Sequence, residues 1–263
     1  MTSEHVWGDW VTSVVPRTMN KHNHANVFVP LPGQPEPPDV TIRAGDPLSS
    51  QVKVVCGECN SGWLNRVQQS ARPFLEPLFE GATHHLDTGA QAKIATWIAM
   101  ATMTGEFLSQ DPRRVAVSQA DRTWLKNHST VPSSWCIWIG RYRWHRAVPQ
   151  SSHLSLHVLD SDTLPDGLTD EHTRPNTQTT AFSIGQMFAF AMSSEFPEVP
   201  HGWDWRTAAS ANLKLHKIRP MQESSIAWPP AEMTDAEAQA YPVAFVHYMD
   251  RRVGFASITA RAS

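Results

Sequence analysis

Cysteine is scarce in this chain. Its 263 residues include only three cysteines, Cys56, Cys59 and Cys136, too few for the disulfide framework that stabilises many small secreted domains. The first residues also lack the basic segment and following apolar stretch of a secretory signal. Both absences favour a reduced protein located in the cytoplasm.

Long apolar runs and a strong excess of one charge are missing as well. The most apolar stretch, residues 95–108, is interrupted by Thr and Gly and is shorter than the roughly 20 residues that cross a bilayer, so we expect no membrane partner. The formal net charge is -3. Any contact with nucleic acid therefore needs a local basic patch.

The chain is, by contrast, well supplied with residues that build a core. Hydrophobic residues make up 41% of it and charged residues 18%, with 11 Trp and 10 Phe, which is unlike the composition of disordered chains. The length suits either one large domain or a small module joined to a larger domain. We expect a module at residues 1–80 and an α+β domain with helices and antiparallel sheet at residues 81–263.

Hydrophobic periodicity predicts the main elements. Helices are expected at residues 10–15, 60–71, 89–108, 118–127 and 234–240, the last with Thr234 and Glu237 as a capping pair. Strands are expected at residues 51–55, 135–144, 153–159, 178–191 and 213–219. Pro73 and Pro77 should limit the second helix to about Ala71, leaving a short helical segment up to Phe79. Residues 17–50, rich in Pro, Asn and His, should form a loop-rich insertion with short strands at 27–29 and 40–42.

Two short motifs carry groups suited to phosphodiester hydrolysis. Glu4 and His5 are adjacent near the N-terminus, and Asn60 follows the Cys56-Gly57-Glu58-Cys59 sequence at the start of an amphipathic stretch. Histidine is a suitable base near neutral pH, and a hard divalent cation such as Mg²⁺ prefers oxygen ligands, including carboxylates and side-chain amides. Together these groups indicate a metal-assisted hydrolase.

The sequences TSEHVWGDW, at residues 2–10, and VVCGECNSGW, at residues 54–63, resemble HNH-type (ββα-metal) endonucleases. The resemblance covers roughly residues 3–70 and is to the subgroup that has Glu-His in the first strand and Cys-x-x-Cys-Asn at the helix start. It implies that His5 is the general base, that Glu4 and Asn60 hold Mg²⁺ or another divalent ion, and that Cys56 and Cys59 bind a structural Zn²⁺. It also implies an N-terminal ββα-metal module and a nucleic-acid substrate, which we expect to be DNA.

The zinc site that this resemblance implies is incomplete in the sequence. Proteins of this kind usually carry another Cys-x-x-Cys shortly before Glu-His, whereas only three residues precede Glu4 here, and a structural zinc takes four ligands. One explanation is that Met1 lies inside a longer reading frame. The alternatives are that His22 and His24 complete the site or that the Cys pair binds no metal. A redox role of the Cys pair is disfavoured because no βαβ pattern precedes it.

The long separation of His5 from Asn60 requires the insertion at 17–50 to loop out of the module, which closure entropy permits. The middle asparagine of the HNH motif has two candidates, Asn23 and Asn26.

The densest basic and aromatic cluster lies further along the chain. Four of its residues are candidates for phosphate contacts and base stacking: Arg141, Arg143, Trp144 and Arg146. The alternative is an edge strand with solvated arginines. Cys136, between Trp135 and Ile137, is expected in the core.

The leading hypothesis from the sequence is a metal-dependent endonuclease. The rival hypothesis is a non-catalytic nucleic-acid or protein binding module derived from the HNH fold, which the net negative charge and the incomplete zinc site favour.

Overall fold

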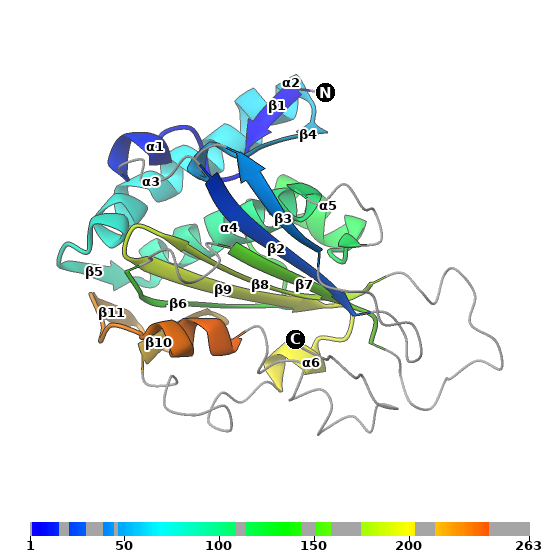
Figure 1. The fold of residues 1–263 in the computed structure, drawn as a ribbon. Helices are drawn as coiled ribbons and strands as arrows, with labels where there is room; N and C mark the ends of the chain where they lie inside the picture. Colours follow the sequence, from blue (N-terminus) through cyan, green and yellow to red (C-terminus); the bar gives the residue numbers. More distant parts are fainter. Residues whose placement is uncertain are drawn as a thin grey trace, which may run out of the picture.

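The computed structural model describes residues 2–15, 21–29, 39–44, 47–108, 114–143, 151–158, 175–202 and 214–241. Its largest feature is a seven-stranded sheet in the order β10-β6-β9-β8-β7-β2-β3 (Figure 1). The strands are β2 (Lys21–Val29), β3 (Asp39–Ala44), β6 (Trp135–Arg141), β7 (Ser151–Leu156), β8 (Thr177–Ile184), β9 (Met187–Ser194) and β10 (Leu215–Arg219). Neighbouring strands are antiparallel except β2 and β7, which pair in parallel.

Helices cover both faces of this sheet, and the side-chain alternation of β6 explains why. Trp135, Ile137 and Ile139 join one apolar cluster, whereas Cys136 and Trp138 join the other, because successive strand residues point to opposite faces. The first cluster packs against α3 (Asn65–Glu80), α4 (Thr88–Gly105) and α5 (Gln119–His128). The second packs against α6 (Glu198–His201) and the helix at 235–241.

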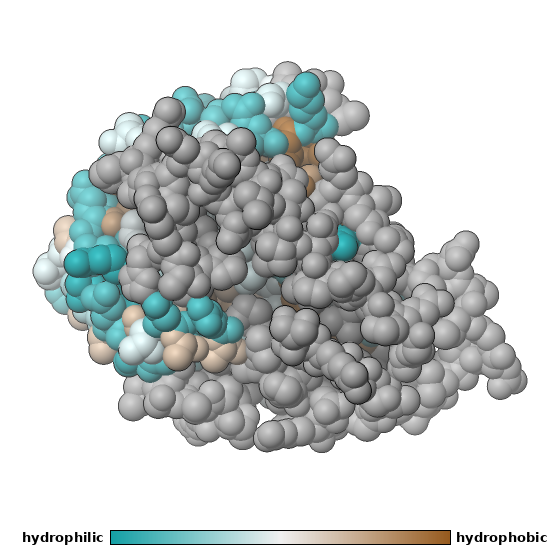
Figure 2. All heavy atoms as spheres, viewed as in Figure 1, coloured by the Kyte–Doolittle hydropathy of each residue, from teal (hydrophilic) through white to brown (hydrophobic). Residues whose placement is uncertain are grey.

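A small strand pair carries the N-terminal motif beside this sheet. β1 (Thr2–His5) pairs antiparallel with β4 (Gln51–Val55), and the short helix α1 (Val11–Val14) follows β1. After β4 come α2 (Gly57–Cys59), a π-helical segment (Asn60–Leu64) and α3. Gly62 departs from helical geometry, so the chain bends between the Cys pair and α3. In Figure 2 hydrophilic residues follow the rim of the molecule over α3, whose inner face is buried.

Three further short elements complete the description. β5 (His84–Asp87) pairs antiparallel with β11 (Ser225–Trp228), and 3-10 helices lie at Pro47–Ser49 and Glu106–Leu108. No helix among the described residues combines the length and the apolar character that crossing a membrane requires.

The predicted α+β fold with antiparallel sheet is confirmed, as are several individual elements. β4, α4 and α5 lie where the periodicity placed them, and Cys136 is buried in the core as expected. Thr234 and Glu237 form the predicted reciprocal cap, since the Glu237 carboxylate accepts from Thr234 N at 2.6 Å and Thr234 Oγ1 accepts from Glu237 N at 3.3 Å.

The predicted end of the second helix at Ala71 is wrong. α3 continues through Pro73 and Pro77 to Glu80. Each proline removes one helix hydrogen bond, but Pro73 is exposed and Pro77 half-buried, so water can satisfy the released carbonyl groups. Burial of Leu75 and Leu78 on the opposite face of α3 favours the helix over the local preference of the prolines.

Two other segments contain more regular structure than the sequence predicted. The loop-rich insertion at 17–50 contributes β2 and β3 to the large sheet, where pairing with β7 stabilises residues of low strand propensity. The single strand expected at 178–191 is the hairpin β8-β9. Gly185 turns it with a φ of +57°, and a Cβ there would come 2.2 Å from the Phe79 carbonyl oxygen.

The predicted division at residue 80 runs through a shared core. Trp7, next to the N-terminal motif, packs against Phe182 of β8 with ring centroids 4.6 Å apart, and both belong to the same apolar cluster. The N-terminal segment is therefore anchored on the large sheet.

Candidate functional site

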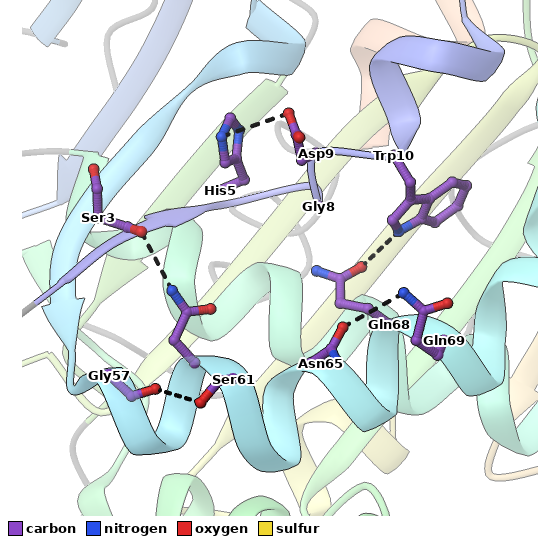
Figure 3. A pocket seen from close by; sticks show the side chains of 11 residues that line it. Ser3, His5, Gly8, Asp9, Trp10, Gly57, Ser61, Asn65, Gln68 and Gln69 are labelled. Carbon is purple, nitrogen blue, oxygen red and sulfur yellow. Dashed lines mark hydrogen bonds and ion pairs between the residues drawn. The ribbon is translucent and has the colours of Figure 1, made fainter.

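A polar cavity of about 550 Å³ opens where the N-terminal motif meets the start of the helices (Figure 3). Three segments line it: β1 with the turn that follows, the α2 region, and the first turns of α3. Its lining residues are Ser3, His5, Gly8, Asp9, Trp10, Gly57, Asn60, Ser61, Asn65, Gln68 and Gln69. Two of the predicted site residues, His5 and Asn60, thus face one cavity although they are far apart in the sequence.

His5 ends β1 and is held by its strand partner. Gln51, opposite it in β4, places Nε2 2.6 Å from His5 Nε2, while Gln51 Oε1 accepts from Ser3 Oγ at 2.7 Å. An amide nitrogen only donates, so in this orientation of the Gln51 amide the acceptor is His5 Nε2. His5 Nδ1 is buried without a hydrogen-bond partner among the described residues. An imidazole in its neutral form has one acceptor nitrogen and can serve as a general base.

Asp9 stands beside this imidazole. Its Oδ1 lies 3.7 Å from His5 Nε2, and Figure 3 shows the carboxylate directed at the ring. The Asp9 side chain is 84% exposed, so water screens the pair. A proton taken up by His5 would place a cation next to this carboxylate, which would stabilise the protonated ring.

Asn60 is positioned by the strand that carries His5. Its Nδ2 donates to the Ser3 carbonyl oxygen at 3.3 Å. That bond uses the nitrogen of the amide and leaves Oδ1 as the atom suited to a hard cation. Glu4 lies between Ser3 and His5 in β1, opposite Val52, and its side chain lies outside the described part of the structure.

The Cys pair forms a compact turn at the start of α2. Cys56 is the N-cap, and its Sγ accepts from Cys59 N at 3.2 Å. Hydrogen bonds from the side chain and the backbone of Cys59 lower the pKa of the exposed Cys56 thiol below its usual value. A lowered pKa favours the thiolate, which is the form that binds metals. Both cysteines are free thiols.

The described residues do not complete a zinc site around the Cys pair. A structural zinc takes four ligands, and in the described ranges no three His, Cys, Asp or Glu side chains are grouped so that they could hold a metal ion. His22, His24, Asn23 and Asn26 lie in β2, where the backbone is described but the side chains are not.

Among the lining residues that the sequence did not single out, Asp9 and Gln68 are the most relevant to function, and Gly8 lies close to both. Asp9 carries a weak signal, since it follows His5 by four residues, but only the turn at Gly8 brings it to the ring. Gly8 has a φ of +83°, and a Cβ there would lie 2.5 Å from Gln68 Oε1. Gln68 itself is a polar residue at a buried position of the apolar helix face between Val67 and Ala71.

The chain has no significant match among known protein families, curated proteins or solved structures.

The predicted nucleic-acid contacts lie elsewhere in the fold. Arg141 is in β6, which is an internal strand rather than the edge strand of the alternative prediction. Its Nε donates to Gln186 Oε1 at 3.1 Å, and its guanidinium lies 3.5 Å from the Glu232 carboxylate. Arg143 is exposed, and Trp144 and Arg146 lie outside the described residues. Of the four, Arg141 has part of its charge compensated by Glu232.

A second cavity, of about 380 Å³, has a basic character that the sequence did not indicate. Arg66 of α3, Lys93 of α4 and Arg219 of β10 line it, and its lining includes no carboxylate. Arg66 directly follows Asn65, which lines the polar cavity. One helix therefore contributes to both cavities.

Proposed function

We propose that the protein is a metal-dependent endonuclease that hydrolyses phosphodiester bonds in nucleic acid, with His5 as the general base. The observation that supports this most is the joint position of His5 and Asn60 on one polar cavity. The resemblance of their motifs to HNH-type endonucleases agrees with it.

The donor set at this cavity fits a hard divalent cation. Asn60 keeps Oδ1 uncommitted because Ser3 holds Nδ2, and Asp9 presents an exposed carboxylate at the same cavity. Mg²⁺ takes such oxygen ligands and retains several waters, so few protein groups suffice. Asn60 would hold the ion, together with Glu4 as the motif implies, and the ion would offset negative charge on the phosphate and the leaving oxygen.

The protein groups perform the proton transfer. In its neutral form, His5 would take a proton from the attacking water at Nε2, which lies between Gln51 and Asp9. For this the Gln51 amide must release Nε2, which is feasible because Gln51 is exposed. Asp9 then faces the imidazolium and stabilises it.

The basic cavity supports a polyanionic partner, which we propose is DNA. Arg66, Lys93 and Arg219 gather on a protein whose net charge is -3, so the positive charge is local. A DNA strand whose scissile phosphate lay beside His5 would have further phosphates within reach of α3, which lines both cavities.

The test is cleavage of plasmid DNA with Mg²⁺, Mn²⁺ or Ni²⁺ by the wild-type chain and by His5→Ala. His85→Ala is a matched control, since His85 is exposed on β5 away from the lining of the cavity. We expect nicking by the wild type and the control and its loss in His5→Ala. Equal nicking by all three proteins would show that His5 is not the base. Intact DNA together with salt-sensitive binding would instead favour the non-catalytic binding module.

A further inference from the structure

Gln68 is an unusual residue for the inner face of a helix. It lies on α3 with only 5% of its surface exposed. Its Oε1 accepts from two indole nitrogens, Trp10 Nε1 at 3.0 Å and Trp97 Nε1 at 2.8 Å. Figure 3 shows the contact with Trp10 at the wall of the polar cavity.

The two indoles determine which end of the amide faces the cavity. An indole N–H can only donate, so the atom between Trp10 and Trp97 must be the oxygen. A flipped amide would place its NH₂ group against two donors, which is unfavourable. The orientation of Gln68 therefore follows from its neighbours.

The other end of the amide is left without a partner. Gln68 Nε2 is buried and has no hydrogen-bond acceptor among the described residues, while Gln68 lines the cavity that contains His5. Buried polar groups are normally hydrogen-bonded, so a donor held in this way indicates an acceptor that arrives with a ligand. The cavity lining contains no Lys or Arg, which leaves the amide as a preorganised neutral donor.

We propose that Gln68 is a substrate-binding residue whose Nε2 donates to a non-bridging oxygen of the phosphate to be cleaved. This deepens the proposed function and rests on it for the identity of the substrate. A phosphate oxygen is a strong acceptor with lone pairs for such an N–H group. A phosphate bound at Gln68 would lie in the same cavity as His5, so the amide would position it for water activated by that base.

The experiment measures DNA binding separately from cleavage. All variants are made in the His5→Ala background, and a short fluorescein-labelled DNA duplex is titrated while its anisotropy is followed. Gln68→Glu keeps oxygen acceptors for both indoles but presents no N–H group to the cavity. Gln69→Glu adds the same charge at the neighbouring, exposed lining residue and measures the effect of charge alone.

We expect Gln68→Glu to raise the Kd about tenfold more than Gln69→Glu, as loss of a hydrogen bond to a charged group predicts. Equal Kd values for the two variants would overturn the proposal. A second measurement uses the chain with Gln68 intact, in case Gln68→Glu does not fold. The NMR signals of the Gln68 side-chain NH₂ group should shift when the duplex is added, and unchanged signals at saturation would also overturn it.

The two proposals fail in distinguishable ways. If the wild type leaves DNA intact but Gln68→Glu still weakens binding selectively, the endonuclease proposal fails and the phosphate contact remains. If the wild type cleaves DNA and Gln68→Glu binds like Gln69→Glu, only the role of Gln68 is wrong.

Discussion

Asn60 Nδ2 donates to the Ser3 carbonyl oxygen at 3.3 Å, and this bond ties the start of the helical segment to the strand that carries His5. The Asn60 amide thus joins the two motifs through its nitrogen, and its oxygen Oδ1 can still bind a cation. If that oxygen binds the catalytic cation, the two functions of Asn60 can be separated by substitution.

Asn60→Asp keeps a side-chain oxygen and loses the N–H group, whereas Asn60→Ala loses both. We expect Asn60→Ala to reduce the cleavage rate about 100-fold, because stabilisation by a metal ion contributes several kcal/mol. Asn60→Asp should retain clearly more activity. Cleavage rates at saturating Mg²⁺, with Mg²⁺ affinity from calorimetry, measure both effects. Equal rates in the two variants would mean that the bond to Ser3, rather than metal binding, is what matters.

Asp9 allows a similar separation of roles. An exposed pair 3.7 Å apart contributes at most about 1 kcal/mol, so Asp9→Asn should slow cleavage by less than about fivefold if the carboxylate only stabilises protonated His5. A loss near 100-fold, accompanied by weaker Mg²⁺ binding, would instead identify Asp9 as a metal ligand. Ser61→Ala, at the same cavity, controls for general disturbance of the lining.

The sequence predicted those parts of the fold and site that depend on local patterns. The helix α4 and the capping pair Thr234 and Glu237 were predicted from local patterns, and both are found. α4 is, however, buried on all sides from Ile94 to Thr104 rather than along one stripe. α3 continues through Pro73 and Pro77 because its inner face is buried, and this burial cannot be predicted from the local sequence. The pairing of β5 with β11 likewise joins two four-residue segments that are far apart in the sequence.

The same distinction applies to the candidate site. His5 and Asn60 were found because they belong to recognisable motifs. Asp9 and Gln68 could not be assigned, since one depends on the turn at Gly8 and the other on indoles contributed by α4 and by the segment after β1. Their roles follow from tertiary contacts alone.

The basic cavity and the predicted Arg141 cluster lead to opposite expectations for DNA binding. Arg66→Ala should weaken binding and reduce the slope of log K against log salt concentration by about one, as loss of one phosphate contact does. Arg141→Ala should leave the slope nearly unchanged, because Glu232 and Gln186 already engage that guanidinium. Anisotropy titrations at several salt concentrations distinguish the two sites. The reverse pattern would restore the assignment made from the sequence.

A buried carboxylate beneath the sheet predicts how stability depends on pH. Glu106 is fully buried and accepts from Ala116 N at 2.9 Å and Val117 N at 3.0 Å, with Arg122 and His153 beside it. Burial opposes its ionisation, but the contacts with His153, Arg122 and Ala116 outweigh burial, and the pKa of Glu106 is lowered.

A lowered pKa means that Glu106 stabilises the fold above the unfolded value of about 4.3 and that this contribution is lost as the pH falls through the folded value. We expect the free energy of unfolding, measured in urea, to fall on acidification below about pH 4. Glu106→Gln should lower the free energy of unfolding near neutral pH by about 3 kcal/mol, since it removes the buried carboxylate that pairs with Arg122. It should also make this free energy less dependent on pH below about pH 4. If the free energy of unfolding of this variant fell on acidification as much as that of the wild type, other carboxylates would be responsible for the pH dependence.

The three cysteines should differ in reactivity, and the difference tests the zinc site. Cys56 is exposed and its pKa is lowered by the hydrogen bonds from Cys59, whereas burial raises the pKa of Cys136. Because the thiolate is the reactive form, iodoacetamide should modify Cys56 first and Cys136 last, as peptide mass spectrometry can measure. If Cys56 and Cys59 bind Zn²⁺, modification of Cys56 should be slow until a chelator is added and fast afterwards, with one equivalent of zinc released. If the purified protein contained no zinc and the chelator did not change the rate of Cys56 modification, the Cys pair would act without metal as the cap of α2.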